Sequence, residues 1–263
     1  MGDPAGIGPE LCLRLIDTPL DRGVRLVIVG SGSVLRAVAE RLGIADAMAA
    51  IPIVGSADPA SVTAAWSTSG TVPLIVDLGP DAERVRAGAV DAETGRASFE
   101  YVERAIELAL GGVVDAVVTG PIHKEAWHAA GVPYPGHTEL FSERTGAQRT
   151  CMMLTSEAIT CSLVTTHIGL ADVARAIDSE RIRTVIELTG HAMQRLRGRP
   201  PRLGVCGLNP HAGEHGLFGY GEEERVIEPA LAAARTAGWN VEGPLSADTA
   251  FTPDQRRRFD AYV

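Results

Sequence analysis

The sequence predicts an α/β fold in which a mostly parallel sheet is covered by helices on both faces. Short apolar runs alternate with longer segments of helical periodicity along the chain, as in βαβ units. Loops rich in Gly, Pro, Asn and Ser follow most of the apolar runs. The chain has 263 residues, 45% of them hydrophobic, which is enough for a real core.

The elements are expected in alternating order. The expected strands cover 25–29, 72–78, 113–118, 150–154, 160–165, 202–206 and a strand and loop over 240–249. The expected helices cover 8–17, 34–42, 94–110, 123–130, 140–144, 170–177, 179–197 and 223–237. The segments 55–70 and 79–92 are expected to be irregular connections, and 259–263 resembles the start of a strand.

Composition narrows the possible partners. The net charge is −9, which argues against nucleic acid as a main partner because phosphate binding needs a basic face. No apolar run approaches the roughly 18 residues of a membrane span, and no secretory signal precedes the first motif. The four cysteines form no CxxC pair, so we expect reduced core residues in a cytoplasmic protein.

A strand, a glycine-rich turn and a helix at 25–42 invite a dinucleotide-binding interpretation. The turn reads Gly30-Ser31-Gly32-Ser33, but position 35 is Leu35, so the third glycine of the dinucleotide fingerprint is missing. We therefore interpret this segment as an ordinary connection between a strand and a helix.

The most informative loop covers 207–216. It directly follows an expected buried strand and contains Asn209, Pro210, His211, Glu214 and His215. Polar loops at the carboxyl ends of strands are where α/β proteins bind ligands. Two imidazoles and a carboxylate within five residues suggest a metal site or a proton-transfer site.

Other loops share this placement and are expected to line one crevice with it. The side chains gathered there would be His123, Lys124, His137, Thr138, His167, His211, Asp248 and Thr249. His167 and His211 are candidate metal ligands, and the third ligand could be Asp248, His137 or a residue beyond 263. Lys124, the only lysine, and Thr138 suit a phosphate or a carboxylate. His128 and His191 lie within helical patterns and are interpreted as structural, and His215 stays undecided.

At these loops the sequence resembles the 4-hydroxythreonine-4-phosphate dehydrogenases of pyridoxal phosphate biosynthesis. The resemblance rests on several long motifs that occur in family order. The matching segments are 1–10, 119–125, 135–139, 165–167, 207–214 and 243–249.

The resemblance implies an α/β/α sandwich like that of the isocitrate and isopropylmalate dehydrogenases. Residues 1–263 would be one incomplete dehydrogenase unit of two intertwined subdomains, and two chains would form a homodimer with active sites at the interface. The implied reaction is oxidation of 4-hydroxythreonine 4-phosphate, followed by decarboxylation. It would use NAD or NADP and one divalent metal ion, which could be Zn, Mg, Co or Mn.

The resemblance also implies roles for individual residues. His137 and Thr138 would contact the substrate, His167 and His211 would bind the metal, and Asp248 is a candidate for proton transfer. Family members have a strand before the Gly-Asp-Pro turn and, beyond the position of Val263, a Tyr-His-Asp-Gln-Gly motif with a third metal histidine. We therefore expect the chain to be a fragment, and a chain that ended at Val263 would bind metal poorly.

Three alternatives stay open. The D-threonate and D-erythronate 4-phosphate dehydrogenases share the resemblance, and Glu139-Leu140, His167-Ile168 and 216–219 look closer to that branch. A metal-dependent phosphohydrolase could use the same histidines, but it would need clustered carboxylates. A non-catalytic binding protein is the third alternative.

Overall fold

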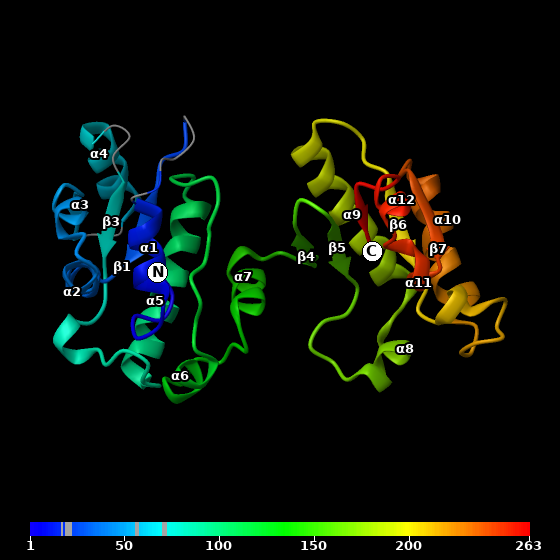
Figure 1. The fold of residues 1–263 in the computed structure, drawn as a ribbon, viewed down its shortest axis with the longest axis horizontal. Helices are drawn as coiled ribbons and strands as arrows, with labels where there is room; N and C mark the ends of the chain where they lie inside the picture. Colours follow the sequence, from blue (N-terminus) through cyan, green and yellow to red (C-terminus); the bar gives the residue numbers. More distant parts are fainter. Residues whose placement is uncertain (17, 19–22, 56–57, 70–72) are drawn as a thin grey trace. The chain divides into compact units, whose positions relative to one another are not determined.

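The computed structural model describes the chain except residues 17, 19–22, 56–57 and 70–72 (Figure 1). Contacts divide the chain into two compact units, Met1–Ala147 and Gln148–Val263. The described strands form one sheet in each unit, so the α/β prediction is confirmed, with two smaller sheets in place of one large sheet.

The first unit is built on a parallel sheet with the strand order β1-β3-β2. Strand β1 covers Val27–Gly30, β2 covers Ile53–Val54 and β3 covers Leu74–Asp77. Side chains alternate along these strands, so each strand supplies both faces of the sheet. Leu74, Ile75 and Val76 are all fully buried, which shows that both faces of β3 are covered.

Helices form a layer on each face of this sheet (Figure 1). On one face, α1 (Gly8–Ile16), α2 (Gly32–Leu42) and α3 (Ala45–Ala49) pack against Ile28 and Ile75. On the other face, α4 (Pro59–Ser69) and α5 (Ala92–Leu110) pack against Val29, Leu74 and Val76. The first unit is therefore an α/β/α sandwich.

Three shorter elements complete the first unit. The turn η1 (Ala82–Arg84) precedes α5, and α6 (Lys124–Ala129) and α7 (His137–Thr145) pack beside α5. Trp127 of α6 and Leu140 of α7 join a small core with Phe99 of α5. This core fixes the first residues of α6 and α7, where Lys124 and His137 lie.

The second unit holds a sheet of order β4-β5-β8-β6-β7. Its strands are β4 (Met152–Thr155), β5 (Thr160–Leu163), β6 (Leu203–Cys206), β7 (Val241–Leu245) and β8 (Ala261–Tyr262). Strand β4 pairs antiparallel with β5, and all other pairs are parallel. The carboxyl ends of β5, β6 and β7 therefore face the same edge.

Helices and turns cover this sheet and connect its strands. The long helices α9 (Ser179–Arg197) and α10 (Glu228–Thr236) pack on one face, and α11 (Ala247–Ala250) packs with Phe259 and Tyr262 on the other. The remaining elements are η2 (Leu170–Asp172), α8 (Val173–Ala176), η3 (Pro210–Gly213), the π-helical turn η4 (Glu223–Ile227) and α12 (Pro253–Arg256).

Two expectations about secondary structure are wrong. Segment 55–70 was expected to be irregular, but 59–69 form α4; positions 56–57 and 70 lie outside the described residues. The helix forms because Val62 and Trp66 are one turn apart and buried, and Asp58 accepts a hydrogen bond from the Ser61 N–H. Segment 113–118 was expected to be a buried strand but has no regular structure, and Val118 is 92% exposed. The N–H of Val113 instead bonds to the Leu108 carbonyl and closes the end of α5.

Candidate active site

Three of the six predicted site residues lie at the carboxyl edge of the second sheet. His167 follows β5, His211 lies in η3 after β6, and Asp248 lies in α11 after β7. Elements η3 and α11 are in contact. The placement follows from the parallel pairing of the strands, because parallel strands end at the same edge.

His211 and Asp248 form the centre of this edge. Nδ1 of His211 lies 3.7 Å from Oδ2 of Asp248, and the two side chains are 59% and 54% exposed. This separation is longer than a hydrogen bond but allows electrostatic attraction. With Nδ1 directed at a carboxylate, Nε2 of His211 is left for another partner, an arrangement common among metal-binding histidines.

Asp248 is held by its own turn. The Ser246 hydroxyl donates a hydrogen bond to Oδ1 of Asp248, and this bond holds the pKa of the carboxyl below its usual value. The nearby His211 lowers that pKa further. Asp248 is therefore an anion at neutral pH and presents a fixed negative charge to His211.

The backbone around His211 has an unusual conformation. All residues from His211 to Gly216 have positive φ, and those at His211, Ala212, Glu214 and His215 are 53°, 54°, 43° and 57°. For residues other than glycine this conformation costs on the order of 1–2 kcal/mol each. Strain of this kind persists only where the surrounding structure enforces it.

Two buried carboxylates, which sequence reasoning missed, fasten the start of this loop. Oε1 of Glu223 accepts hydrogen bonds from the N–H groups of Leu208 and Asn209 at 2.9 and 2.7 Å. The Asn209 amide donates to Oε2 of Glu223 at 3.0 Å and to Oε2 of Glu222 at 3.1 Å. Oε2 of Glu222 also accepts from the Tyr220 N–H, and this bond contributes most to lowering the pKa of Glu222. Hydrogen bonds to charged groups contribute roughly 1.5–3 kcal/mol each, which is enough to offset the strain.

The loop fits closely around these carboxylates. A Cβ atom at Gly213, which has φ 79°, would lie 2.5 Å from Oε2 of Glu223. A Cβ atom at Gly219 would lie 2.3 Å from the Asn209 amide nitrogen. In the sequence, Glu222 and Glu223 form a pair of glutamates that opens a helix directly after a glycine-rich loop. The burial of these two side chains cannot be predicted from the local pattern.

The structure brings together only part of the predicted metal site. His167 has φ 59° and is exposed on the loop after β5. Within the described ranges, no group of three or more His, Cys, Asp or Glu side chains could hold a metal ion. The His211–Asp248 pair nevertheless fits a metal ligand and its outer carboxylate, because the imidazole is exposed and a neighbouring anion orients it.

The other predicted site residues lie in the first unit. Lys124 begins α6, and His137 and Thr138 begin α7. A Cβ atom at Gly136 would lie 3.8 Å from Cε of Lys124, so the start of α7 lies beside the lysine side chain. Lys124 and Thr138 are exposed, which leaves a cation and a hydroxyl free to meet an anion.

His137 is partly enclosed by the small core of the first unit. Its ring lies edge-on to the Trp127 ring at 5.8 Å, and its Nε2 atom is buried without a hydrogen-bond partner. Burial lowers the pKa of His137, so the imidazole is neutral at neutral pH. The expectation that His137 and Thr138 share a crevice with His167 and His211 joins both units and stays a prediction.

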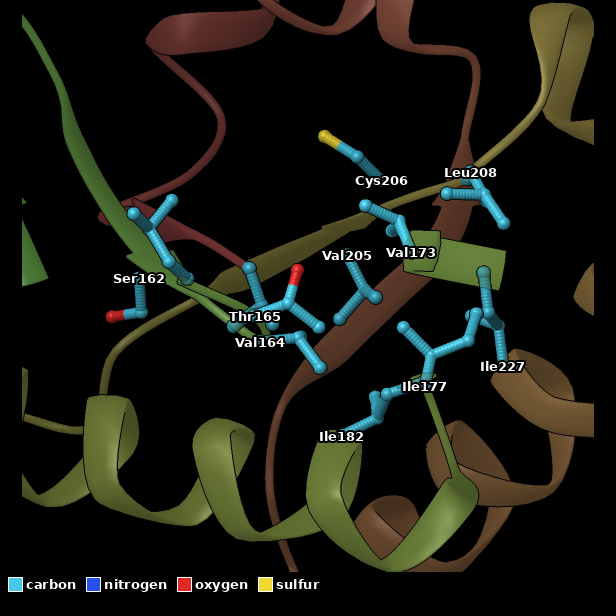
Figure 2. A pocket seen from close by; sticks show the side chains of 13 residues that line it. Ser162, Val164, Thr165, Val173, Ile177, Ile182, Val205, Cys206, Leu208 and Ile227 are labelled. Atoms are coloured by element: carbon cyan, nitrogen blue, oxygen red, sulfur yellow. The ribbon is translucent and has the colours of Figure 1, made fainter. Parts of the chain in front are cut away.

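A pocket of about 220 Å³ opens beside the ends of β5 and β6 (Figure 2). Val164, Ile177, Ile182, Val205 and Ile227 point into it. This apolar lining does not suit a phosphate or a carboxylate, because burying a charge without partners is costly. The charged ends of a substrate would therefore bind at the exposed loops and not in this pocket.

The glycine-rich turn after β1 does not resemble a dinucleotide site. Oδ1 of Asp77 accepts a hydrogen bond from the Gly32 N–H at 2.6 Å, and Oγ of Ser31 accepts one from the Val34 N–H at 3.1 Å. A carboxylate thus occupies the position at the start of α2 that a pyrophosphate would need. This geometry supports the interpretation of an ordinary turn.

In the part of the chain that the structure describes, no helix is long and apolar enough to cross a membrane. The cysteines are unpaired and half-buried; they are Cys12, Cys151, Cys161 and Cys206.

Comparisons with known proteins point to one family. The family model of the pyridoxal phosphate biosynthetic protein PdxA matches residues 22–263. The chain is 41% identical to the D-threonate 4-phosphate dehydrogenase of Cupriavidus necator and 40% identical to the 4-hydroxythreonine-4-phosphate dehydrogenase of Beijerinckia indica. All of the chain is matched, and it covers 77% and 75% of these proteins.

Solved structures of dehydrogenases are also similar to this chain. The crystal structure of a 4-hydroxythreonine-4-phosphate dehydrogenase from Klebsiella pneumoniae matches all of the chain with a TM-score of 0.82 and 37% identity, and the chain covers 77% of it. A terephthalate 1,2-cis-dihydrodiol dehydrogenase from Burkholderia xenovorans matches with a TM-score of 0.66 and 28% identity, and the chain covers 76% of it.

Proposed function

The chain belongs to the family of the pyridoxal phosphate biosynthetic protein PdxA and is an oxidoreductase of the dehydrogenase class, and on this premise we propose a specific reaction. It oxidises a four-carbon hydroxy acid that carries a terminal phosphate, using NAD or NADP and one divalent metal ion, and the product is then decarboxylated. The observation that carries this proposal is the pairing of His211 with Asp248 at the carboxyl edge of the second sheet.

Two substrates fit the proposal equally. Relatives named for 4-hydroxythreonine 4-phosphate and for D-threonate 4-phosphate are almost equally similar to this chain, at 40% and 41% identity. Both compounds have a carboxylate, a hydroxyl on the third carbon and a terminal phosphate, and they differ in whether the second carbon carries an amine or a hydroxyl. Oxidation of the third carbon gives a β-keto acid in both cases, and such acids lose carbon dioxide readily.

In this proposal the residues of the first unit bind the substrate, and two histidines of the second unit bind the metal ion. Lys124 and Thr138 bind the anionic end of the substrate, and neutral His137 forms a hydrogen bond with it. His167 and His211 hold the divalent metal ion, which could be Zn, Mg, Co or Mn. When bound, the nicotinamide cofactor supplies the hydride acceptor, and the metal ion stabilises negative charge on the substrate oxygens.

Asp248 acts mainly through its charge in this proposal. A carboxylate with a lowered pKa is a weak base at neutral pH, which makes it a poor proton acceptor. The same low pKa keeps it ionised beside Nδ1 of His211, where it orients the ring. We therefore favour an orienting role for Asp248 over the proton transfer that the sequence suggested.

The expectations on assembly and location remain part of the proposal. A homodimer with active sites at the interface would let a second chain add ligands that the described residues of one chain do not assemble. The unpaired cysteines fit a reducing compartment such as the cytoplasm. The phosphohydrolase alternative is disfavoured, because the described residues contain no carboxylate cluster for a two-metal site and the relatives are named dehydrogenases.

The decisive experiment is an assay of the full-length protein with each substrate. We expect NADH or NADPH formation with 4-hydroxythreonine 4-phosphate or D-threonate 4-phosphate, loss of this signal after treatment with a chelator, and recovery when a divalent metal is added. Release of inorganic phosphate without reduction of the nicotinamide would overturn the proposal in favour of a phosphohydrolase.

A further inference from the structure

We infer that Glu223 is the residue that positions His211, by fastening Asn209 to a buried carboxylate. This inference rests on the proposed role of His211 in binding a divalent metal. The hydrogen bonds of Glu223 go to Leu208 and Asn209, and not to His211 or Asp248. Glu223 is therefore a positioning residue and not a catalytic residue.

The carboxylate of Glu223 is buried and is satisfied by the loop. The residue is 1% exposed, and its hydrogen bonds come from the Leu208 N–H, the Asn209 N–H and the Asn209 side-chain amide. Among the ion pairs of the described residues, none involves Glu223. A buried carboxylate is costly unless N–H groups donate hydrogen bonds to it, so the loop and the carboxylate hold each other in place.

The chain between Asn209 and His211 is short and stiff. Only Pro210 separates them, and its ring fixes φ near −65°. A change at Asn209 therefore moves His211 with little freedom to compensate. His211 itself has φ 53°, a conformation that relaxes unless its neighbours enforce it.

The position of Glu223 in its own helix also fits this role. It is the first residue of the π-helical turn η4, which leads into α10. Turns of this kind are rare and often occur at functional sites. Ile227, at the end of the turn, is 3% exposed and packs in the core of the second unit, so the carboxylate is held by a rigid support.

The chemistry of Glu223 suggests a nearly isosteric test. All three partners of the carboxylate are N–H donors. In Glu223→Gln, one oxygen becomes an NH₂ group that faces another donor, so at least one hydrogen bond is lost while the shape is kept. Glu228→Gln is the matched control, because Glu228 is exposed in the same region of the chain.

The experiment measures binding of Zn²⁺ or Co²⁺ to the metal-free, full-length protein by isothermal titration calorimetry. We expect Glu223→Gln to weaken metal binding roughly 10- to 100-fold, as loss of an outer partner does elsewhere, and Glu228→Gln to leave it unchanged. In a His211→Ala background, Glu223→Gln should cause no further loss. A purely structural role would instead give losses that multiply.

The outcomes separate this inference from the proposed function. If His211→Ala binds metal as the wild type does, the proposed metal site is wrong and the inference is wrong with it. If His211→Ala weakens binding but Glu223→Gln does not, or if the two losses multiply, only the inference is overturned. Should Glu223→Gln fail to fold by circular dichroism, Asn209→Ala takes its place, because it removes only the side-chain bonds to Glu222 and Glu223.

Discussion

His211 and Asp248 meet at the carboxyl edge of the second sheet, with Nδ1 of the histidine 3.7 Å from Oδ2 of the aspartate. They are 37 residues apart in sequence, and parallel pairing of β6 with β7 brings them together. The carboxylate orients an imidazole that is 59% exposed, so Nε2 can face an outside partner. It is the geometric basis of the proposed metal site.

The first prediction compares two histidines of one loop. His211→Ala should reduce dehydrogenase activity and retained metal by more than about 100-fold, because loss of a ligand should exceed the roughly 10- to 100-fold cost of losing an outer partner. His215→Ala is the control, since His215 is also exposed with positive φ but lacks the contact with Asp248. Elemental analysis and a nicotinamide assay measure both variants, and equal losses in the two would contradict the assignment.

The second prediction concerns the pKa of Asp248. The Ser246 hydroxyl is the main cause of its low pKa, so Ser246→Ala should move that pKa up toward the ordinary aspartate value of about 3.9. The wild-type carboxylate should stay ionised to lower pH than the carboxylate in the variant. Titration of the Asp248 side-chain carbon by NMR measures this shift. Thr249→Val should leave it in place, and an unchanged midpoint in Ser246→Ala would refute the account.

The third prediction links His137 to stability. Burial lowers the pKa of His137 in the folded state, so the unfolded chain binds a proton more readily. The free energy of unfolding should therefore contain a contribution that is present above the unfolded pKa of about 6.5 and is lost as pH falls through the folded pKa. Urea unfolding between pH 7.5 and 5 measures it.

The control for this effect is a histidine with a different environment. His137→Gln should remove part of the pH dependence because glutamine does not titrate. His128→Gln should keep it, since His128 is exposed on α6. An identical pH dependence in His137→Gln and the wild type would show that burial beside Trp127 does not control the protonation of His137.

How far the sequence predicts the site depends on whether the signal is local. His211 and Asp248 each follow an apolar strand, so the expectation that they share an edge needed only the strands and their parallel order. The hydrogen bonds from the loop to Glu223 could not be predicted. The side chain of Glu223 is buried against a loop that is distant in sequence, and the Leu208 N–H that bonds to it lies 15 positions earlier. The positive φ of Ala212 could not be predicted either, since alanine rarely adopts that conformation.

The two errors in the fold have a common physical origin. Apolar content at 113–118 predicts burial but does not say whether a partner strand is present, and Val118 is exposed. Small residues at 55–70 hide a helix whose buried face consists of little more than Val62 and Trp66. In both segments tertiary contacts decide the structure, and the local pattern is weak.

The last prediction tests this buried face of α4. Trp66 is 8% exposed and packs with Val62 against β3, and the Arg25 guanidinium lies 4.4 Å from the centre of its ring. Trp66→Ala should lower the free energy of unfolding by about 3–5 kcal/mol, as large aromatic truncations in cores do. Thr63→Ala, on the exposed face of the same helix, should change it by less than about 0.5 kcal/mol. Urea unfolding followed by circular dichroism measures both, and a similar small effect in the two variants would mean that 59–69 behaves as the irregular connection that its composition predicts.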